Sequence, residues 1–401
     1  MRRAPHQVGR GARAGFTLVE LILSLGLFSL LLVGLLQLLD TSTTLWKRVD
    51  AQRDETEVAG ALAERIARDL STLEAGPEGD LLVDWAMVDV DGNGTAGLPV
   101  ARLRFVRRAA PGEVTRLRAD QAVELDPELL TDEVLAELEA AAGWARIDRG
   151  LVETTWVLAK ADRPVDPGAR VEPAFEGVLL RGERFLGDPD RISFFDERFL
   201  PVTSTTGRPT AGLTDELLRG VLWLEPTLAT QTTVTDADLH PEATPRRWEA
   251  GDGLDDGATS WDAWGLDRPD LSRTERNEPG VGMPDLDPAR PGATPLLPRR
   301  IRVAFEIQPP GALRPTLRSS IDHTETTFAV SDGLRLPEPG GHVLVGEEWM
   351  LVRDVRGDRV TVERAVRGSQ RGPHGAGALV QHGWRTEREV PVAVFREDWS
   401  L

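Results

Sequence analysis

The first 40 residues of the chain constrain its fold most strongly. Four arginines (positions 2, 3, 10 and 13) precede an apolar run from Phe16 to Leu39, in which Glu20 is the only ionisable residue. A helix of this length spans roughly 36 Å, enough to cross a bilayer core of about 30 Å. Because basic flanks favour the cytoplasmic side, the residues beyond Asp40 are predicted to lie outside the cytoplasm.

Gly15 lies before the apolar run, whereas a secretory signal peptide has its small-residue cleavage site after a shorter run. Cleavage after Gly15 would remove the basic leader and keep the helix. It would also give Phe16 an α-amino group four residues from Glu20. A carboxylate in a membrane helix costs roughly a few kcal/mol, so Glu20 is expected to have a partner. The alternative is that Glu20 snorkels to the nearby interface.

The string Gly15-Phe16-Thr17-Leu18-Val19-Glu20 resembles the signal of type IV pilins and type II secretion pseudopilins. The resemblance implies that a prepilin peptidase cuts after Gly15 and methylates Phe16. It also implies that Glu20 pairs with a subunit's terminal amine during assembly. The expected location is the bacterial inner membrane, with a single pass, contact with membrane lipid and a globular domain in the periplasm.

The composition excludes several classes of protein. The formal net charge of −18 argues against a nucleic-acid partner, which requires a basic face. The absence of cysteine excludes disulfides, metal–thiolate sites and thiol nucleophiles. At 401 residues the chain has room for a substantial core.

Helical periodicity is predicted to continue beyond the membrane. Val58, Leu62, Ile66, Leu70 and Leu73 recur at intervals of three or four, which places them on one helix face. Charged residues fill much of the remaining surface, and Gly76-Pro77 is expected to end the helix. A transmembrane and stalk helix over residues 16–75 is predicted; a plain signal anchor with a linker is the alternative.

The rest of the chain predicts an α+β fold, in which the long helix packs on an antiparallel sheet. A short acidic helix is expected over Asp126–Ala142. The predicted strands of the globular domain, residues 76–320, are Leu81–Val90, Ala101–Arg107, Leu151–Ala159, Gly177–Arg184, Arg191–Phe195, Gly220–Leu224 and Arg300–Ile307.

Two insertions are predicted within this domain. Residues 228–298 are rich in Asp, Pro, Gly and Thr, and are expected to form an irregular excursion ordered by tryptophans, or a disordered insertion. Residues 321–382 are expected to form a small β module, with a hairpin of Glu348–Val355 and Arg359–Val366. A closing strand, Arg385–Phe395 within residues 383–401, is predicted to lie beside Arg300–Ile307.

The run from Asp89 to Thr95 has the start of a calcium loop. Asp89, Asp91 and Asn93 occupy alternate positions with oxygen ligands, and Gly94 supplies the turn. Val100 stands where a calcium loop has its bidentate glutamate, so another ligand would have to come from elsewhere. The alternative is a bare β-hairpin turn, because Asp-Gly and Asn-Gly are strong turn formers.

No catalytic motif is present. The six histidines lack metal-binding spacing, and the sequence has neither a phosphate-binding loop nor a nucleophile elbow. A non-enzymatic structural role is therefore predicted. Within the pilin superfamily the chain looks most like the minor pseudopilin J group of type II secretion, which has an Arg-Asp-Leu ending to its stalk helix, as at Arg68-Asp69-Leu70. Other pseudopilins are the implied partners. The alternatives are a minor type IV pilus subunit and a signal-anchored periplasmic binding protein.

Overall fold

A computed structural model describes residues 18–76, 78–92, 94, 97–113, 150–162, 173–186, 188, 191–196, 198–200, 206–229, 261–263, 295, 297–298, 300–308 and 314–392. The chain divides into two compact units, residues 1–56 and 57–401. In the first unit the described chain is helical throughout. The second unit holds the end of the same helix and all of the described strands.

The helix α1 runs from Leu18 to Ser71, so the expected long N-terminal helix is confirmed as an element. It ends before the Gly76-Pro77 pair that was expected to stop it. The hydroxyl groups of Ser71 and Thr72 donate hydrogen bonds to the carbonyl oxygens of Arg68 (2.8 Å) and Asp69 (3.0 Å), which satisfies two of the last helical acceptors. Leu73 then forms an antiparallel bridge with Arg107.

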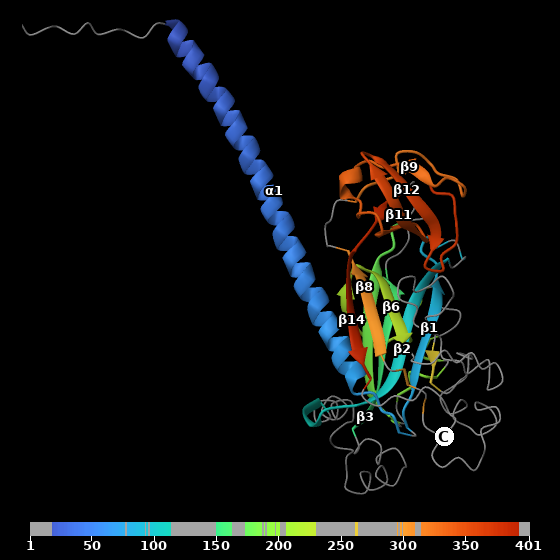
Figure 1. Cartoon of the computed structure of the whole chain (residues 1–401). Coiled ribbons are helices and arrows are strands. Elements are labelled where there is room, and N and C mark those ends of the chain that lie inside the picture. The colour runs from blue at the N-terminus through green and yellow to red at the C-terminus, as the bar shows by residue number, and fades with distance from the viewer. Residues whose placement is uncertain are drawn as a thin grey trace, which may run out of the picture. The chain divides into compact units, whose positions relative to one another are not determined.

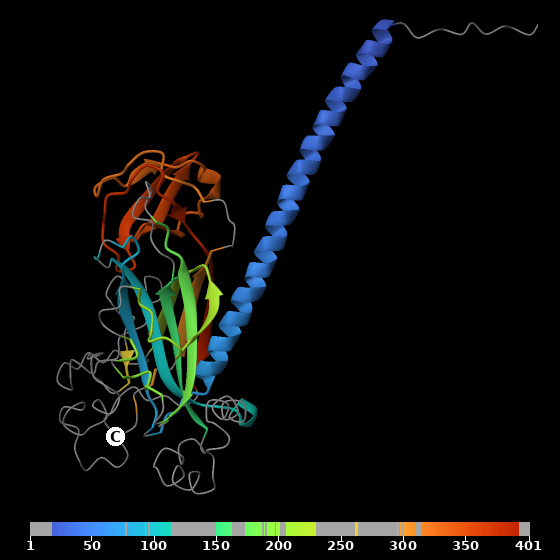
Figure 2. The ribbon, with the colours of Figure 1, turned by 180° about the vertical axis from the view of Figure 1, so that it is seen from behind.

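The described strands form three antiparallel sheets, a short 3-10 helix spans Gly333–Arg335, and the predicted α+β class is confirmed (Figures 1 and 2). The largest sheet has the strand order β5-β4-β3-β2-β1-β7. Its members are Leu81–Val88 (β1), Leu98–Arg108 (β2), Leu151–Lys160 (β3), Gly177–Phe185 (β4), Asp215–Arg219 (β5) and Trp261–Asp262 (β7).

The second sheet has the order β14-β8-β6, formed by Trp384–Pro391 (β14), Arg300–Ile307 (β8) and Val221–Ala229 (β6). Every residue of β8 has a partner in β14, from Arg300 opposite Pro391 to Ile307 opposite Trp384. The predicted pairing of these two distant segments is confirmed. The closing strand ends at Pro391, and residues 393–401 lie outside the described part of the chain.

The third sheet has the order β13-β10-β11-β12-β9 and lies within the residues predicted to form an inserted module. Its strands are Thr327–Ala329 (β9), His342–Val345 (β10), Glu348–Arg356 (β11), Arg359–Val366 (β12) and Val380–Gln381 (β13). The β11–β12 hairpin was predicted, and Arg356 pairs with Arg359 across its turn. Gly357, at φ +60°, supplies the left-handed conformation that this short turn needs.

One hydrophobic core joins the end of α1 to the first two sheets. Leu62, Ile66 and Leu70 are buried in it together with residues of β1, β2, β3, β6 and β8. Val58, which the sequence placed on the same face, is 44% exposed, and Ala59 and Ala63 take up the buried face instead. The third sheet has a core of its own, formed by residues such as Val343, Met350 and Val362.

The predicted strand Arg191–Phe195 is wrong, because these residues form a bend and a turn and pair with no strand. Phe194 and Phe195 are buried in two separate hydrophobic clusters, so their apolar character serves packing of a loop. The Glu153 carboxylate on β3 accepts hydrogen bonds from the Ser193 hydroxyl and from the Phe194 amide (2.8 Å), which fixes the turn. The strands β5 and β7 were not expected.

β7 lies in the predicted irregular excursion, where Trp261 pairs with Val83 of β1. Trp261 is 4% exposed, so this tryptophan does hold its short segment against the large sheet. Most of residues 228–298, and the predicted helix Asp126–Ala142, lie outside the described residues.

Candidate functional site

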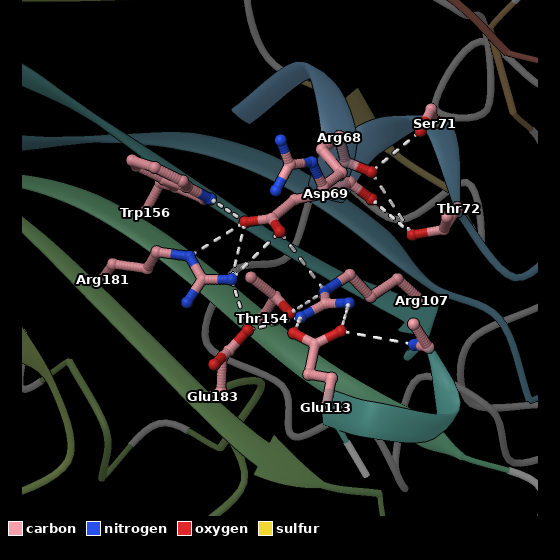
Figure 3. Close-up of polar contacts among 11 residues, drawn as sticks. Arg68, Asp69, Ser71, Thr72, Arg107, Glu113, Thr154, Trp156, Arg181 and Glu183 are labelled. Carbon is pink, nitrogen blue, oxygen red and sulfur yellow. Dashed lines mark hydrogen bonds and ion pairs between the residues drawn. The ribbon is translucent and has the colours of Figure 1, made fainter. Parts of the chain in front are cut away.

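The end of α1 is fixed to the large sheet through one buried carboxylate, that of Asp69. Its Oδ2 accepts hydrogen bonds from Nε of Arg181 (2.9 Å) and from Nε1 of Trp156 (3.1 Å), and its Oδ1 accepts one from Nη2 of Arg181 (3.0 Å). Nε of Arg107 lies 3.7 Å from Oδ1. Figure 3 shows these side chains converging from α1, β2, β3 and β4. Asp69 therefore links the helix to three neighbouring strands.

Two further acids complete this cluster, which we call the Asp69 network. The Glu183 carboxylate contacts both Arg181 and Arg107. Glu113 accepts a hydrogen bond from Nη1 of Arg107 at 3.0 Å, and the Thr154 hydroxyl accepts one from Nε at 2.9 Å. Each buried charge thus has a partner of opposite sign, which a charge needs when it is removed from water.

The pKa values follow from this pairing. Burial alone would raise the pKa of Glu183, but its hydrogen bond to Arg181 and the charges of Arg181 and Arg107 lower it to about 2. Burial opposes the charged form of Arg107 as well, yet the hydrogen bond to Glu113 and the neighbouring acids raise its pKa. Glu183 and Arg107 therefore stay charged at neutral pH.

Sequence reasoning missed the Asp69 network, because it placed Asp69 among the polar residues of the exposed helix face. Asp69 is 5% exposed. A signal was present: Asp69 follows Ile66 by three positions and precedes Leu70, and both of these residues are fully buried. An acid between two core positions borders the buried face of a helix and needs a cationic partner.

The predicted calcium loop follows β1. Both Asp89 carboxylate oxygens accept backbone amides of the loop itself, Oδ1 from Gly92 (2.6 Å) and Oδ2 from Gly94 (2.8 Å). The Lys160 ammonium group donates to the carbonyl oxygens of Asp89 and Val90, at 2.8 Å each. Asp89 and Lys160 therefore stabilise this turn through hydrogen bonds with backbone groups of the loop itself. Asn93, the third predicted ligand, lies outside the described residues.

The structure brings a third carboxylate to this loop, one that the sequence did not predict. Glu347, in the turn between β10 and β11, has a ligand oxygen within 4.8 Å of those of Asp89 and Asp91. Its carboxylate also accepts the Val90 amide. Burial, together with the charges of Asp91 and Asp89, raises the pKa of Glu347. These three carboxylates could hold a cation between the large sheet and the third sheet.

The N-terminal part of α1 is different in character. Leu21–Leu39 is long and apolar enough to cross a membrane, with a mean hydropathy of 2.4, and none of its side chains is buried in the described structure. Residues 10–36 match the family model described as a prokaryotic N-terminal methylation motif. The chain carries a prepilin-type signal. No curated protein and no solved structure has significant similarity to the chain.

The prepilin-type signal contains all three of the predicted processing and assembly residues. Gly15 and Phe16 lie outside the described residues, so the structure gives no geometry for the cleavage site. Glu20 is the third residue of α1, and its side chain is outside the described part as well. The signal and the apolar helix together indicate an inner-membrane anchor of a pilin or pseudopilin, processed by prepilin peptidase.

Proposed function

We propose that the chain is a minor pseudopilin, a structural subunit of the pseudopilus of a type II secretion system. The observation that carries the proposal is the continuity of α1. One helix begins in the matched prepilin-type signal and ends at Ser71, where the Asp69 network joins it to a β-rich domain. This is the arrangement that a filament subunit with a stalk requires.

In this proposal the chemistry is limited to processing and assembly. Prepilin peptidase removes residues 1–15 and methylates the amine of Phe16. Glu20 then pairs with the terminal amine of another subunit, since a carboxylate in lipid is stabilised by a neighbouring cation. The helices pack side by side as the filament grows, and the domain after α1 contacts other minor subunits or the secreted cargo in the periplasm.

The processing step is tested by mass analysis of the N-terminus of the chain purified from the bacterial envelope. A mature chain that starts with N-methyl-Phe16 is expected. Gly15→Ala should leave the leader attached, whereas Gly11→Ala, a matched change within the leader, should be processed normally. An unmethylated N-terminus that retains the leader in the wild-type chain would contradict the proposal and favour a signal-anchored periplasmic binding protein.

The assembly step is tested with Glu20→Ala. This variant should still be cut and methylated, because the peptidase acts at Gly15, but it should be lost from the complex that co-purifies with neighbouring pilin-like subunits. Glu57→Ala, which also removes an acid from α1, serves as the matched control. Normal incorporation of Glu20→Ala would contradict the pairing of Glu20 with the terminal amine of another subunit.

A minor subunit of a type IV pilus is the second candidate. The additional five-stranded sheet at 327–381 favours it, since an added module suits adhesion at a filament tip. Deletion of the gene separates the two candidates. Loss of protein secretion with normal surface pili is expected for a pseudopilin, and loss of pili or adhesion with normal secretion would support the pilus subunit.

A further inference from the structure

A group of buried polar side chains lies where the third sheet meets the second. Glu306 of β8, Trp349 of β11 and Arg367, which follows β12, are 3%, 0% and 5% exposed. The Arg367 guanidinium group pairs with the Glu306 carboxylate, and its Cζ lies 4.4 Å from the centre of the Trp349 ring. These contacts place three polar side chains in one buried group, which we call the Arg367 cluster.

Each member of the Arg367 cluster keeps one polar atom without a hydrogen bond. Nη2 of Arg367 donates to Oε1 of Glu306. By contrast, Nη1 of Arg367, Oε2 of Glu306 and Nε1 of Trp349 are buried and have no hydrogen-bond partner among the described residues. Buried polar atoms are costly when unpaired, and in folded proteins they are nearly always bonded to protein groups or to ordered water. Three such atoms in contacting side chains therefore indicate a common partner.

The side chains around the cluster do not supply these hydrogen bonds. Nδ1 of His342 lies 3.9 Å from Oε1 of Glu306, which is beyond hydrogen-bond distance. The Trp223 ring lies 4.8 Å from Cζ of Arg367, and its own N–H donates to Glu225 at 3.4 Å. Trp223 thus covers the guanidinium group without offering it an acceptor.

The backbone also holds the cluster in a fixed position. Arg367 has a φ of +56°, in the left-handed region that residues other than glycine rarely adopt. Such a conformation persists only where the surrounding structure enforces it. The guanidinium group is therefore constrained from both its backbone and its aromatic neighbours, and it has little freedom to move toward another acceptor.

The chemistry of the three atoms defines their partner. Nη1 of a guanidinium group and Nε1 of an indole can only donate, whereas a carboxylate oxygen accepts. A partner that satisfies all three atoms must accept two hydrogen bonds and donate one. An anion would meet the charge of Glu306, and a cation would meet that of Arg367. A water molecule both accepts and donates, and a buried water typically makes about three hydrogen bonds.

We infer that the Arg367 cluster binds one buried water molecule. The water accepts hydrogen bonds from Nη1 of Arg367 and Nε1 of Trp349 and donates one to Oε2 of Glu306. Because Glu306 belongs to the second sheet and the other two residues to the module of the third, this water links the two sheets. A water-mediated contact is nearly as favourable in enthalpy as a direct hydrogen bond. The water is thus a structural part of the junction, whatever the function of the chain.

The water is detected at the indole proton of Trp349. Full-length chain in detergent is prepared with isotopically labelled tryptophan, and cross-relaxation between water and each indole N–H is measured by NMR in the rotating frame. The sign of the signal separates a bound water from proton exchange with the solvent. The resonance of Trp349 is the one missing from Trp349→Phe. A bound-water signal is expected at Trp349 and not at Trp156, whose N–H donates to Asp69 at 3.1 Å.

Glu306→Gln tests the bridge to β8. The amide oxygen would stay with Nη2 of Arg367, so an N–H group would face the water and the bound-water signal at Trp349 should be lost. Glu225→Gln is the matched control, because it changes another buried acid of the second sheet and should keep the signal.

Three results would overturn the inference. The first is the absence of a bound-water signal at Trp349 in the wild-type chain. The second is an equal signal at Trp156, which would indicate general access of solvent to the indoles. The third is a signal at Trp349 that persists in Glu306→Gln, since the water would then not link the sheets. The comparison of Trp349 with Trp156 uses the wild-type chain, so it decides the matter even if Glu306→Gln does not fold.

Discussion

At the scale of single residues, the Asp69 carboxylate decides how the helix meets the sheet. Hydrogen bonds from Arg181 and Trp156 leave little freedom for its position, because both partners are themselves buried. A buried ion pair adds little stability relative to an apolar pair of equal volume, but removal of one partner leaves an uncompensated charge. Substitution of Asp69 should thus lower the free energy of unfolding, whatever the net contribution of the intact ion pair to stability.

We expect Asp69→Asn to destabilise the second unit by about 3 kcal/mol, since the variant leaves Arg181 and Arg107 with one carboxylate fewer. Urea unfolding of the full chain in detergent, followed by tryptophan fluorescence, measures the change. Asp354→Asn is the control, because Asp354 forms an exposed ion pair with Arg356 and its substitution should cost less than about 1 kcal/mol. Equal effects of the two variants would show that the Asp69 network does not anchor the helix.

Glu347 offers a test of the calcium hypothesis. The pKa of Glu347 is raised in the folded chain. Once the pH exceeds the ordinary pKa of a glutamate, the unfolded chain loses this proton more readily, so the free energy of unfolding falls. Without calcium at neutral pH, Glu347→Gln should therefore raise the thermal unfolding midpoint. Calcium should raise the midpoint of the wild-type chain, since the ion compensates the three carboxylates, and should have no such effect on Glu347→Gln.

Glu338→Gln, an exposed acid of the same module, should respond to calcium as the wild-type chain does. Absence of any calcium effect on the wild-type midpoint, together with no heat of binding in isothermal titration of either the wild-type chain or Asp91→Ala, would end the calcium hypothesis. The loop would then be a turn held by the hydrogen bonds of Asp89, Lys160 and Glu347.

At the scale of elements, α1 is one helix with two kinds of surface. Its first turns expose leucines around the whole circumference, as at Leu30 and Leu31, which suits a lipid or filament environment. Its last turns bury one stripe in the core shared by two sheets. Most of the stability of such a stripe comes from packing and not from helix propensity.

Two residues that the sequence places on the same helix face, Ile66 and Val58, should respond differently to substitution by alanine. Ile66 is fully buried and Val58 is 44% exposed. Ile66→Ala should cost about 2–5 kcal/mol through lost burial and a residual cavity, whereas Val58→Ala should change stability by about 0.5 kcal/mol or less. Chemical denaturation of the full chain compares them. A large effect of Val58→Ala would mean that the face of the helix is wrongly assigned.

At the scale of the whole second unit, the third sheet is joined to the other two by buried polar and aromatic contacts. The Arg367 guanidinium lies between the rings of Trp223 (4.8 Å) and Trp349 (4.4 Å) and pairs with Glu306 of β8. Cation–π contacts of this kind strengthen when the cation is removed from water. The Gln381 amide bonds both backbone groups of Phe175, at 2.8 Å each. The third sheet is therefore packed directly against the first two.

His342 makes this junction sensitive to acid. Burial and the charges of Arg367 and Arg385 lower the pKa of His342 to about 2, and the 3.9 Å approach to Glu306 does not reverse this because Glu306 already pairs with Arg367. The folded chain keeps this imidazole neutral, whereas the unfolded chain binds a proton below about pH 6.5. The stability that the folded chain has above pH 6.5 is therefore reduced as the pH falls below that value, because only the unfolded chain takes up the proton.

From this linkage we expect the free energy of unfolding to fall between pH 7 and pH 5, with His342 contributing about 2 kcal/mol of the loss by pH 5. Urea titrations at several pH values measure the slope. His342→Gln should flatten it, whereas His323→Gln, an exposed histidine of the same module, should not. An unchanged slope in His342→Gln would show that folding does not lower the pKa of this imidazole.

The local patterns of the sequence determined the long helix, most strands of the large sheet and the β11–β12 hairpin, because periodicity and turn residues act over a few neighbouring positions. They also determined the prepilin-type signal, which is a contiguous string within residues 10–36. The predicted pairing of Arg300–Ile307 with the closing strand succeeded because the two runs flank the inserted module, so the chain returns beside the strand that it left. Arg191–Phe195 failed because buried phenylalanines in a loop resemble a strand.

Only the tertiary structure decided which charges lie together. Arg107, Arg181 and Glu183 are distant in sequence from Asp69, and Glu347 is separated from Asp89 by most of the chain. Charged residues in a sequence look alike whether they are solvated or buried. Their roles depend on partners that the sheets bring within a few ångströms. The sequence by itself therefore identified the prepilin-type signal, and the fold determined how the end of the helix is held.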